Sequence, residues 1–251
     1  MKKFIALLII LSAFTSSASA EVLTVFAAAS MQYSLEKISS IYTNLNPDVE
    51  IVYNFDSSGT LKTQIIEGAD CDLFISAAQK QMNALDKAGL IDSESRINLL
   101  ENKIVLVVPE GNPAKINSYD DLKSGQINLI ALGNSDVPVG AYSQEILTNM
   151  GIWDKLNSEK KISFASNVTE VAMQVRESVV DCGIVYATDA ATHKLMIIGE
   201  APAGMLKTPV IYPAAIIKNA KNPVRAKNFL EFLQSSQAIK IFSSIVFSMA
   251  K

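Results

Sequence analysis

Four apolar runs of the sequence each end in small or hydroxyl-bearing residues that stand directly before a helical pattern. These four junctions are Ala29-Ser30, Ser57-Ser58-Gly59, Pro138-Val139-Gly140 and Asn167-Val168. The first N–H groups of a helix have no partner within it, and the helix dipole adds a partial positive charge there. Such a junction is therefore suited to bind an anion. Because none of the four contains a lysine or an arginine, the donors would be hydroxyls and backbone N–H groups.

The same residues also have ordinary structural interpretations. Ser30, Ser58 and Asn167 have the residue type and the position of helix N-caps. Val139 and Val168, taken singly, would be assigned to the core or to loops. The functional interpretation rests on the agreement of several weak signals in different parts of the sequence.

A fifth apolar run, Gly183–Tyr186, ends in a tyrosine that could add a phenolic O–H group to these donors. Taken alone, Tyr186 would be a packed core residue. The elements that carry all these residues alternate between strand and helix, which is typical of largely parallel sheets with helices on both faces. In such α/β folds the ligand lies at the carboxyl ends of the strands, where the five candidate residues stand.

Two extended apolar runs, Ile104–Val108 and Val210–Ile217, are the candidates for strands that cross between two lobes. They divide the chain into lobe I, residues 21–103 plus 208–251, and lobe II, residues 104–207. Two of the four junctions then fall in each lobe. Pro213 lacks the N–H group that a central strand needs, so the second run is expected at a sheet edge or at a bend.

Residues 1–20 have the pattern of a secretory signal peptide. Two lysines precede the apolar run Phe4–Phe14, and Ala18-Ser19-Ala20 fits the small-residue rule for cleavage, which predicts a mature start at Glu21. The apolar run is too short to span a bilayer. We therefore expect a soluble protein exported to the periplasm, and we expect no lipid anchor because no cysteine lies near the cleavage point.

The composition excludes several classes of function. Without residues 1–20 the chain carries 20 Lys and Arg against 25 Asp and Glu, a net charge of −5, which argues against nucleic acid or acidic lipid as a partner. His193 is the one histidine, no His/Cys/Asp/Glu cluster has metal-ligand spacing, and no Gly-x-Ser-x-Gly motif is present. These absences argue against direct metal-ion ligands and against an enzyme. Cys71 and Cys182 would lie on opposite outer sides of two lobes, so we expect free thiols.

Five segments together resemble the periplasmic molybdate-binding proteins of ABC transporters. They are Phe26–Ser30, Ser57–Leu61, Asp72–Ala77, Val137–Gly140 and Gly183–Tyr186. The resemblance covers essentially the whole mature chain, in order. It implies a two-lobed solute-binding fold of type II, with two mixed, mostly parallel sheets joined by crossing strands.

The resemblance also implies a ligand, its binding residues and its partners. Molybdate or tungstate would be held by the hydroxyl and N–H groups of Ser30 and Ser58, the N–H groups of Val139 and Val168, and the hydroxyl of Tyr186. Molybdenum would thus be bound only as its oxyanion, and no cofactor is implied. A monomer would deliver the ligand to an ABC permease and its ATPase subunit. With no cation or titrating group near the ligand, affinity should change little between about pH 6 and 9.

The sequence departs from the family pattern at two positions. Asp56 stands where a small neutral residue is expected, and Val139 replaces a smaller residue and could narrow the cavity. Another tetrahedral oxyanion is therefore the main alternative ligand. Phosphate would need an acceptor for its remaining proton, which Asp56 could supply, whereas sulfate would differ from molybdate in size alone. A periplasmic enzyme and a scaffold are less supported by the sequence.

Overall fold

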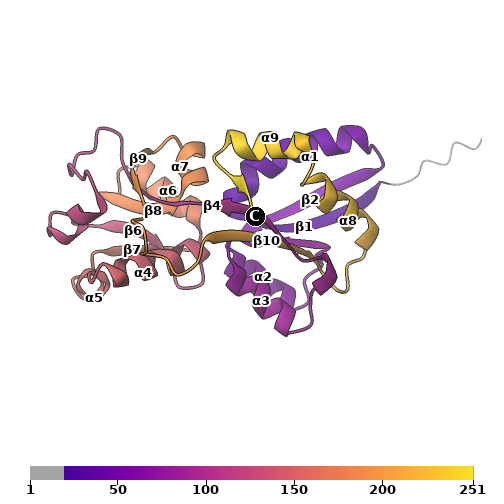
Figure 1. The fold of residues 1–251 in the computed structure, drawn as a ribbon, viewed down its shortest axis with the longest axis horizontal. Coiled ribbons are helices and arrows are strands. Elements are labelled where there is room, and N and C mark those ends of the chain that lie inside the picture. Colours follow the sequence, from indigo (N-terminus) through magenta and orange to yellow (C-terminus); the bar gives the residue numbers. More distant parts are fainter. Residues whose placement is uncertain (1–19, 251) are drawn as a thin grey trace, which may run out of the picture.

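Two lobes lie side by side along the long axis of the molecule, and each is built on one sheet covered by helices (Figure 1). The structure is a computed structural model that describes residues 20–250. The predicted signal segment lies outside the described residues, apart from Ala20 at the predicted cleavage point. Within residues 20–250, no helix combines the length and apolar character that crossing a membrane requires.

The first lobe contains a six-stranded sheet with the strand order β11-β4-β10-β3-β1-β2. Its strands are β1 (Glu21–Ala28), β2 (Val49–Asp56), β3 (Leu73–Ile75), β4 (Ile97–Asn102), β10 (Val210–Ile216) and β11 (Ser248–Met249). Its α-helices are α1 (Gln32–Leu45), α2 (Ser58–Ile66), α3 (Gln79–Lys87), α8 (Pro223–Phe232) and α9 (Ser236–Ser244), with 3-10 turns η1 (Ala29–Met31) and η2 (Ser93–Ser95). Helices α1 and α9 cover one face of this sheet, and α2 and α3 cover the other (Figure 1).

The second lobe contains a five-stranded sheet with the strand order β7-β6-β8-β5-β9. Its strands are β5 (Ile104–Val108), β6 (Ile130–Gly133), β7 (Ile162–Ala165), β8 (Cys182–Tyr186) and β9 (Met196–Glu200). Its helices are α4 (Pro138–Asn149), α5 (Trp153–Ser158), α6 (Val168–Arg176) and α7 (Ala187–Thr192), with the 3-10 turn η3 (Tyr119–Lys123). Helices α6 and α7 lie on one side of the sheet, and α4 and α5 lie on the other (Figure 1).

Both sheets are mixed, as predicted, with a parallel half and an antiparallel half. The parallel half is β2-β1-β3 in the first lobe and β7-β6-β8 in the second. Among the described residues, five of the nine strand pairs are antiparallel, a larger share than the sequence predicts. The reason is that strands next to the lobe crossings run back along the sheet that they join. The parallel halves therefore carry the strand-to-helix junctions.

The chain crosses between the sheets twice, in connections next to the two predicted runs. The prediction that these runs themselves cross is wrong, because each lies within one sheet. Strand β4 ends at Asn102 and β5 begins at Ile104 in the other sheet, so the first crossing is Lys103. The second crossing is the connection between β9 and β10, residues 201–209. We keep the lobe boundaries near residues 103 and 208 as a proposal.

Strand β10 accommodates its internal proline by a shift in register. It lies between β3 and β4, so the predicted sheet edge is wrong, whereas the predicted bend corresponds to the register shift between Tyr212 and Pro213. The carbonyl oxygen of Pro213 still accepts a hydrogen bond from Ser76 N–H at 2.9 Å. A bulge can leave one residue outside the regular ladder, which suits a residue without an N–H group.

The two cysteines lie in different lobes and are buried free thiols. Cys71 precedes β3, and its Sγ lies 3.3 Å from the carbonyl oxygen of Leu73. Cys182 begins β8. Burial raises the pKa of the Cys71 thiol to about 12 and that of Cys182 still further, so both thiols stay protonated and packed at neutral pH.

Candidate functional site

The lobes contact each other around the predicted ligand residues. The hydroxyl of Tyr186, in the second lobe, donates to the carbonyl oxygen of Ala77 in the first at 3.3 Å. At the start of α2, the Cα atom of Gly59 faces the loop before α4, where an added Cβ atom would lie 2.1 Å from the carbonyl oxygen of Asp136. Only a glycine allows this approach of the two backbones, so the lobes are in a closed arrangement.

Ser58 is the first residue of α2 and is fully buried. The N-cap of this helix is Ser57, whose hydroxyl oxygen accepts the Thr60 N–H at 3.1 Å, so the interpretation of Ser58 as a cap is wrong. The Oγ atom of Ser58 instead accepts the N–H of Ala77 at 2.9 Å. Because this bond uses an oxygen lone pair, the hydroxyl proton of Ser58 is free to donate to a ligand.

Ser30 lies inside the 3-10 turn η1 and is also buried. The turn brings the backbone into helical form before α1 begins, so Ser30 makes no capping bond and this N-cap interpretation is wrong too. Its Oγ atom lies 2.9 Å from the hydroxyl oxygen of Tyr212 on β10. The hydroxyl of Ser30 is thus held by a side chain, whereas that of Ser58 is held by the backbone.

Val139 and Val168 place backbone N–H groups at the starts of α4 and α6. Val139 is the second residue of its helix, after Pro138, and Val168 is the first residue of its own. Asn167 caps α6 by accepting the Glu170 N–H at 2.9 Å, as predicted. The Glu170 carboxylate accepts from the N–H and the hydroxyl of Ser166.

Four backbone N–H groups of the predicted site have no acceptor within residues 20–250. They are those of Ser30, Ser58, Val139 and Val168. All four residues are buried, and N–H groups without a partner are rare in the interior of proteins. The first turn of a helix leaves such groups open because no carbonyl precedes them. The arrangement therefore offers anion donors from both lobes.

Tyr186 ends β8 and is fully buried at the interface of the lobes. Its ring packs edge-on against Tyr212, with 5.5 Å between the ring centroids. Burial, together with the neighbouring Tyr212, Tyr142 and Asp189, raises the pKa of Tyr186 well above its ordinary value. The phenol therefore remains a neutral O–H donor at any physiological pH.

A group of buried polar residues beside the site is not predicted from the sequence. They are Asn102, Thr188, Asp189 and Tyr212. Burial raises the pKa of the Asp189 carboxyl to about 7, which contradicts the expectation that no group near the ligand titrates between pH 6 and 9. Thr188 and Asp189 directly follow the strand that ends in Tyr186. Their position at the carboxyl end of that strand is the signal that could have identified them.

Asp56 lies at the end of β2, and its carboxylate is used locally. Its Oδ1 atom accepts the N–H of Ser57 at 2.6 Å, which orients the turn into α2. No group of three or more His, Cys, Asp or Glu side chains within the described residues could hold a metal ion. The donor set fits a small, fully ionised oxyanion that is bound by hydrogen bonds alone.

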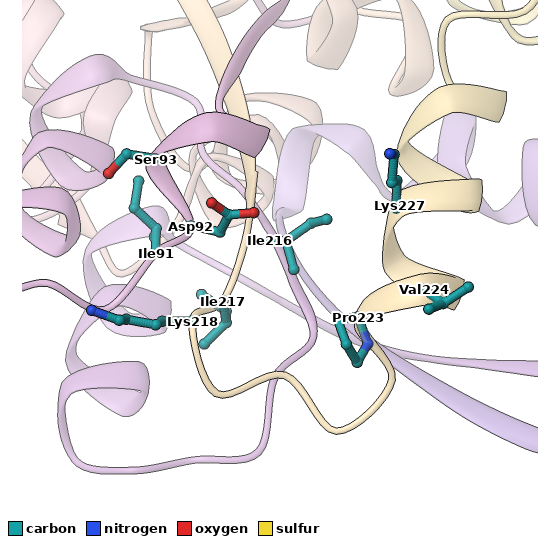
Figure 2. Close-up of a pocket in the computed structure, with 9 residues that line it drawn as sticks. All are labelled: Ile91, Asp92, Ser93, Ile216, Ile217, Lys218, Pro223, Val224 and Lys227. Atoms are coloured by element: carbon teal, nitrogen blue, oxygen red, sulfur yellow. The ribbon is translucent and has the colours of Figure 1, made fainter.

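A surface pocket of about 540 Å³ lies elsewhere, in the first lobe beside β10 and α8 (Figure 2). Its lining residues are Ile91, Asp92, Ser93, Ile216, Ile217, Lys218, Pro223, Val224 and Lys227. None of the predicted ligand residues is among them. A smaller cavity of about 220 Å³ lies between the lobes and includes Ser30, Thr169 and Asp189. We place the candidate site at the interface of the lobes because contacts through Ala77 and Tyr212 link Ser58, Tyr186 and Ser30 there.

Residues 23–244 match the family of bacterial extracellular solute-binding proteins. The chain belongs to this family. It is 39% identical, over 93% of this chain and 89% of the relative, to the putative ABC transporter substrate-binding lipoprotein YvgL of Bacillus subtilis. It is 36% identical to the molybdate-binding protein ModA of Haemophilus influenzae, over 97% of this chain and 96% of that protein.

The fold of this solute-binding protein is similar to that of a solved molybdate-binding protein. The periplasmic molybdate-binding protein of Azotobacter vinelandii has a TM-score of 0.82 and 25% sequence identity, with 91% of this chain and all of that chain covered. The predicted two-lobed α/β solute-binding fold is confirmed. Because the family is extracellular, the protein acts outside the cytoplasm.

Proposed function

We propose that this protein captures molybdate between its two lobes and delivers it to the membrane permease of an ABC transporter. The observation that carries the proposal is the set of four backbone N–H groups, on buried residues and two from each lobe, that have no acceptor within residues 20–250. A tetrahedral dianion between the lobes would accept from all of them. The molybdate-binding relatives in Haemophilus influenzae and Azotobacter vinelandii support molybdate as that dianion.

Three hydroxyls add to this donor set, at Ser30, Ser58 and Tyr186. Ser30 and Ser58 would each donate a charge-assisted hydrogen bond, which is stronger than a bond between neutral groups. Tyr186 would do so once its proton turns from the carbonyl oxygen of Ala77 to the anion. Helix N-termini at Ser58, Val139 and Val168 add their dipoles. With no Lys or Arg in the shell, the dianion is held by dipoles that are fixed before it arrives, and it can be released when the lobes separate.

Closure of the lobes is part of the proposed binding step. The first lobe offers Ser30 and Ser58, and the second offers Val139, Val168 and Tyr186, so an open protein presents only part of the set. The ligand therefore stabilises the closed form by its contacts with both lobes. The Gly59–Asp136 approach shows how closely the backbones meet in that form.

Sulfate and phosphate are less supported as ligands. Phosphate carries a proton at neutral pH that needs an acceptor, and Asp56, whose Oδ1 accepts the Ser57 N–H, is the residue suggested for this role. Phosphate ranks below molybdate because the relatives named above bind molybdate. Sulfate has the same charge as molybdate but is smaller. Donors set for the larger ion would leave sulfate with stretched hydrogen bonds, which weaken steeply with distance.

Several finer points belong to the same proposal. We propose that tungstate, which has nearly the size and charge of molybdate, binds as well. The protein would act as a periplasmic monomer, cleaved after Ala20, with a permease and its cytoplasmic ATPase as partners and no catalytic step of its own. The net charge of −5 for the mature chain, with 20 Lys and Arg against 25 Asp and Glu, argues against a nucleic acid partner.

Calorimetric titration with molybdate, tungstate, sulfate and phosphate tests the proposal. We expect tight binding of molybdate and tungstate and little displacement of molybdate by an equimolar amount of sulfate. X-ray scattering should show a more compact particle with saturating molybdate. Binding of sulfate or phosphate in preference to molybdate would contradict the assignment of the ligand, and an unchanged particle size would contradict closure.

A further inference from the structure

Two buried polar side chains, those of Asn102 and Tyr212, lie next to the two crossings between the lobes and are linked to Ser30 by hydrogen bonds. Asn102 is the last residue of β4, directly before the first crossing. Tyr212 lies on β10, shortly after the second. The Nδ2 atom of Asn102 lies 3.1 Å from the hydroxyl oxygen of Tyr212, which lies 2.9 Å from Ser30 Oγ. These three side chains form a chain of hydrogen bonds that ends at the proposed ligand.

Asn102 fixes the direction of each hydrogen bond in this series. The Oδ1 atom of Asn102 accepts the Lys103 N–H at 2.8 Å, which orients the amide so that Nδ2 faces Tyr212. An amide nitrogen only donates, so the Tyr212 oxygen accepts from it. The Tyr212 proton then points at Ser30 Oγ, its other hydrogen-bond partner within residues 20–250. The proton of Ser30 is left free to donate to the anion.

We propose that Asn102 and Tyr212 are positioning residues that turn the Ser30 hydroxyl into a fixed donor for the bound oxyanion. The inference rests on the proposed function, because it names residues that act on that same site. Without Tyr212 as a donor, Ser30 could point its proton toward other acceptors or rotate. Part of the free energy of binding would then be spent on orienting this hydroxyl.

The same series of hydrogen bonds also reaches the second lobe. The Nδ2 group of Asn102 donates to Thr188 Oγ1, on α7, at 3.0 Å. The ring of Tyr212 packs edge-on against Tyr186, whose hydroxyl is itself a proposed ligand donor. The orientation of the Ser30 proton and the closed position of the lobes therefore depend on the same two side chains.

A double-mutant cycle tests the positioning role, with molybdate as the titrant. The variants are Tyr212→Phe, Ser30→Ala and the double variant. We expect Tyr212→Phe to weaken binding by about 3- to 10-fold, the usual effect of one neutral hydrogen bond. In the Ser30→Ala background the same substitution should have no further effect, because the hydroxyl on which it acts is absent.

Tyr42→Phe is the matched control. Tyr42 is a buried tyrosine of the first lobe whose hydroxyl has no hydrogen-bond partner among the described residues. Its ring packs edge-on against Phe229, with 5.0 Å between the centroids, as the ring of Tyr212 packs against aromatic neighbours. Removal of this hydroxyl should leave the affinity for molybdate unchanged.

The outcomes separate the positioning role from a structural role and from the proposed function. Equal losses of affinity from Tyr212→Phe with and without the Ser30 hydroxyl would overturn the inference. It would also be overturned if the loss from Tyr212→Phe depended on the Tyr186 hydroxyl instead of the Ser30 hydroxyl. If Tyr212→Phe does not fold, as judged by thermal unfolding, Asn102→Ala replaces it. Its effect on affinity should be smaller in the Ser30→Ala background, where only the part due to the lost Thr188 bond remains. Failure of the wild-type chain to bind molybdate would reject the proposed function itself, and the positioning role with it.

Discussion

The two lobes contribute chemically different donors to the same proposed site. The first lobe offers two serine hydroxyls in addition to N–H groups, and each hydroxyl has a partner behind it that holds its oxygen. The second lobe offers the backbone N–H groups of Val139 and Val168, together with one tyrosine hydroxyl. A side-chain substitution can delete a hydroxyl, but it leaves a backbone N–H in place. Substitutions in the two lobes should therefore have very different effects on binding.

The largest effect is expected at the contact between the lobes rather than at a donor. In Gly59→Ala the new Cβ atom would lie 2.1 Å from the Asp136 carbonyl oxygen. Neither backbone can move aside without shifting α2 or α4, so the lobes would stop short of closure. We expect molybdate affinity to fall by about 100-fold or more, equivalent to about 2.8 kcal/mol.

Gly199→Ala is the control for this substitution, because a Cβ atom at Gly199 would meet no atom within 4 Å. The unfolding temperature of ligand-free Gly59→Ala should stay near that of the wild type if the lobes can separate. Calorimetry and X-ray scattering with saturating molybdate measure the two effects. Normal affinity and full compaction in Gly59→Ala would contradict the closed contact as part of binding.

A smaller loss is expected when one hydroxyl is removed from either lobe. Ser58→Ala and Tyr186→Phe each delete one bond to the dianion, and bonds to charged groups contribute about 1.5–3 kcal/mol. Affinity should therefore fall by about 10- to 150-fold, because about 1.4 kcal/mol corresponds to a tenfold change in Kd. Tyr119→Phe is the control for the second, since the buried Tyr119 hydroxyl has no partner within residues 20–250. Similar losses from Tyr119→Phe and Tyr186→Phe would mean that the ligand is placed wrongly.

Much of the fold could be predicted from sequence, because it depends on local patterns. The apolar run Ile104–Val108 is a strand with the predicted bounds. Strands β4 and β9 are not predicted by an apolar run. Strand β9 has exposed or half-buried residues without clear alternation, and β4 includes three polar residues among its six.

The donors of the proposed site could be predicted only in part. Ser58 and Val168 stand at helix starts, which local sequence indicates. Asn102 and Tyr212 are separated by 110 residues in sequence and contact each other because strands β4 and β10 pair. No local pattern carries that information. The same holds for Asp189, whose raised pKa results from burial in the folded protein.

The pH dependence of binding tests the part of the site that local sequence did not reveal. Burial raises the pKa of Asp189 from 3.8 to about 7, and Asp189 shares the cavity between the lobes with Ser30. A bound dianion disfavours the ionised carboxylate, so ligand binding should raise this pKa further. If it rises by one more unit, affinity should fall by about tenfold between pH 6 and pH 9.

Asp189→Asn should remove this pH dependence. His193 lines the same cavity, but burial and Arg176 lower its pKa. It is therefore neutral over most of this range, and His193→Gln should keep the pH dependence of affinity.

The raised pKa of Asp189 also affects the stability of the protein without ligand, in the opposite direction to the usual Asp effect. The folded state binds more protons than the unfolded state between about pH 4 and 7. The stability of wild type relative to Asp189→Asn should therefore fall as pH rises through that window and stay constant above it. A wild-type affinity that does not change with pH would contradict the expected role of Asp189 in binding. A stability difference between wild type and Asp189→Asn that stays constant between about pH 4 and 7 would contradict the raised pKa.

The smallest effect on binding is expected at Val139, where the comparison of the lobes is sharpest. Val139→Ala keeps the backbone N–H at the start of α4, so molybdate affinity should change by less than about twofold, far below the loss of one charge-assisted bond. The side chain is fully buried, and deletion of two methyl groups should lower the free energy of unfolding by about 2 kcal/mol. Affinity and stability would thus separate in the second lobe: the first-lobe Ser58→Ala loses binding and also the acceptor of the Ala77 N–H, whereas Val139→Ala loses stability alone. Calorimetric titration and chemical denaturation of the two variants decide this point, and abolished binding in Val139→Ala would mean that the second lobe holds the ligand by side chains rather than by its backbone.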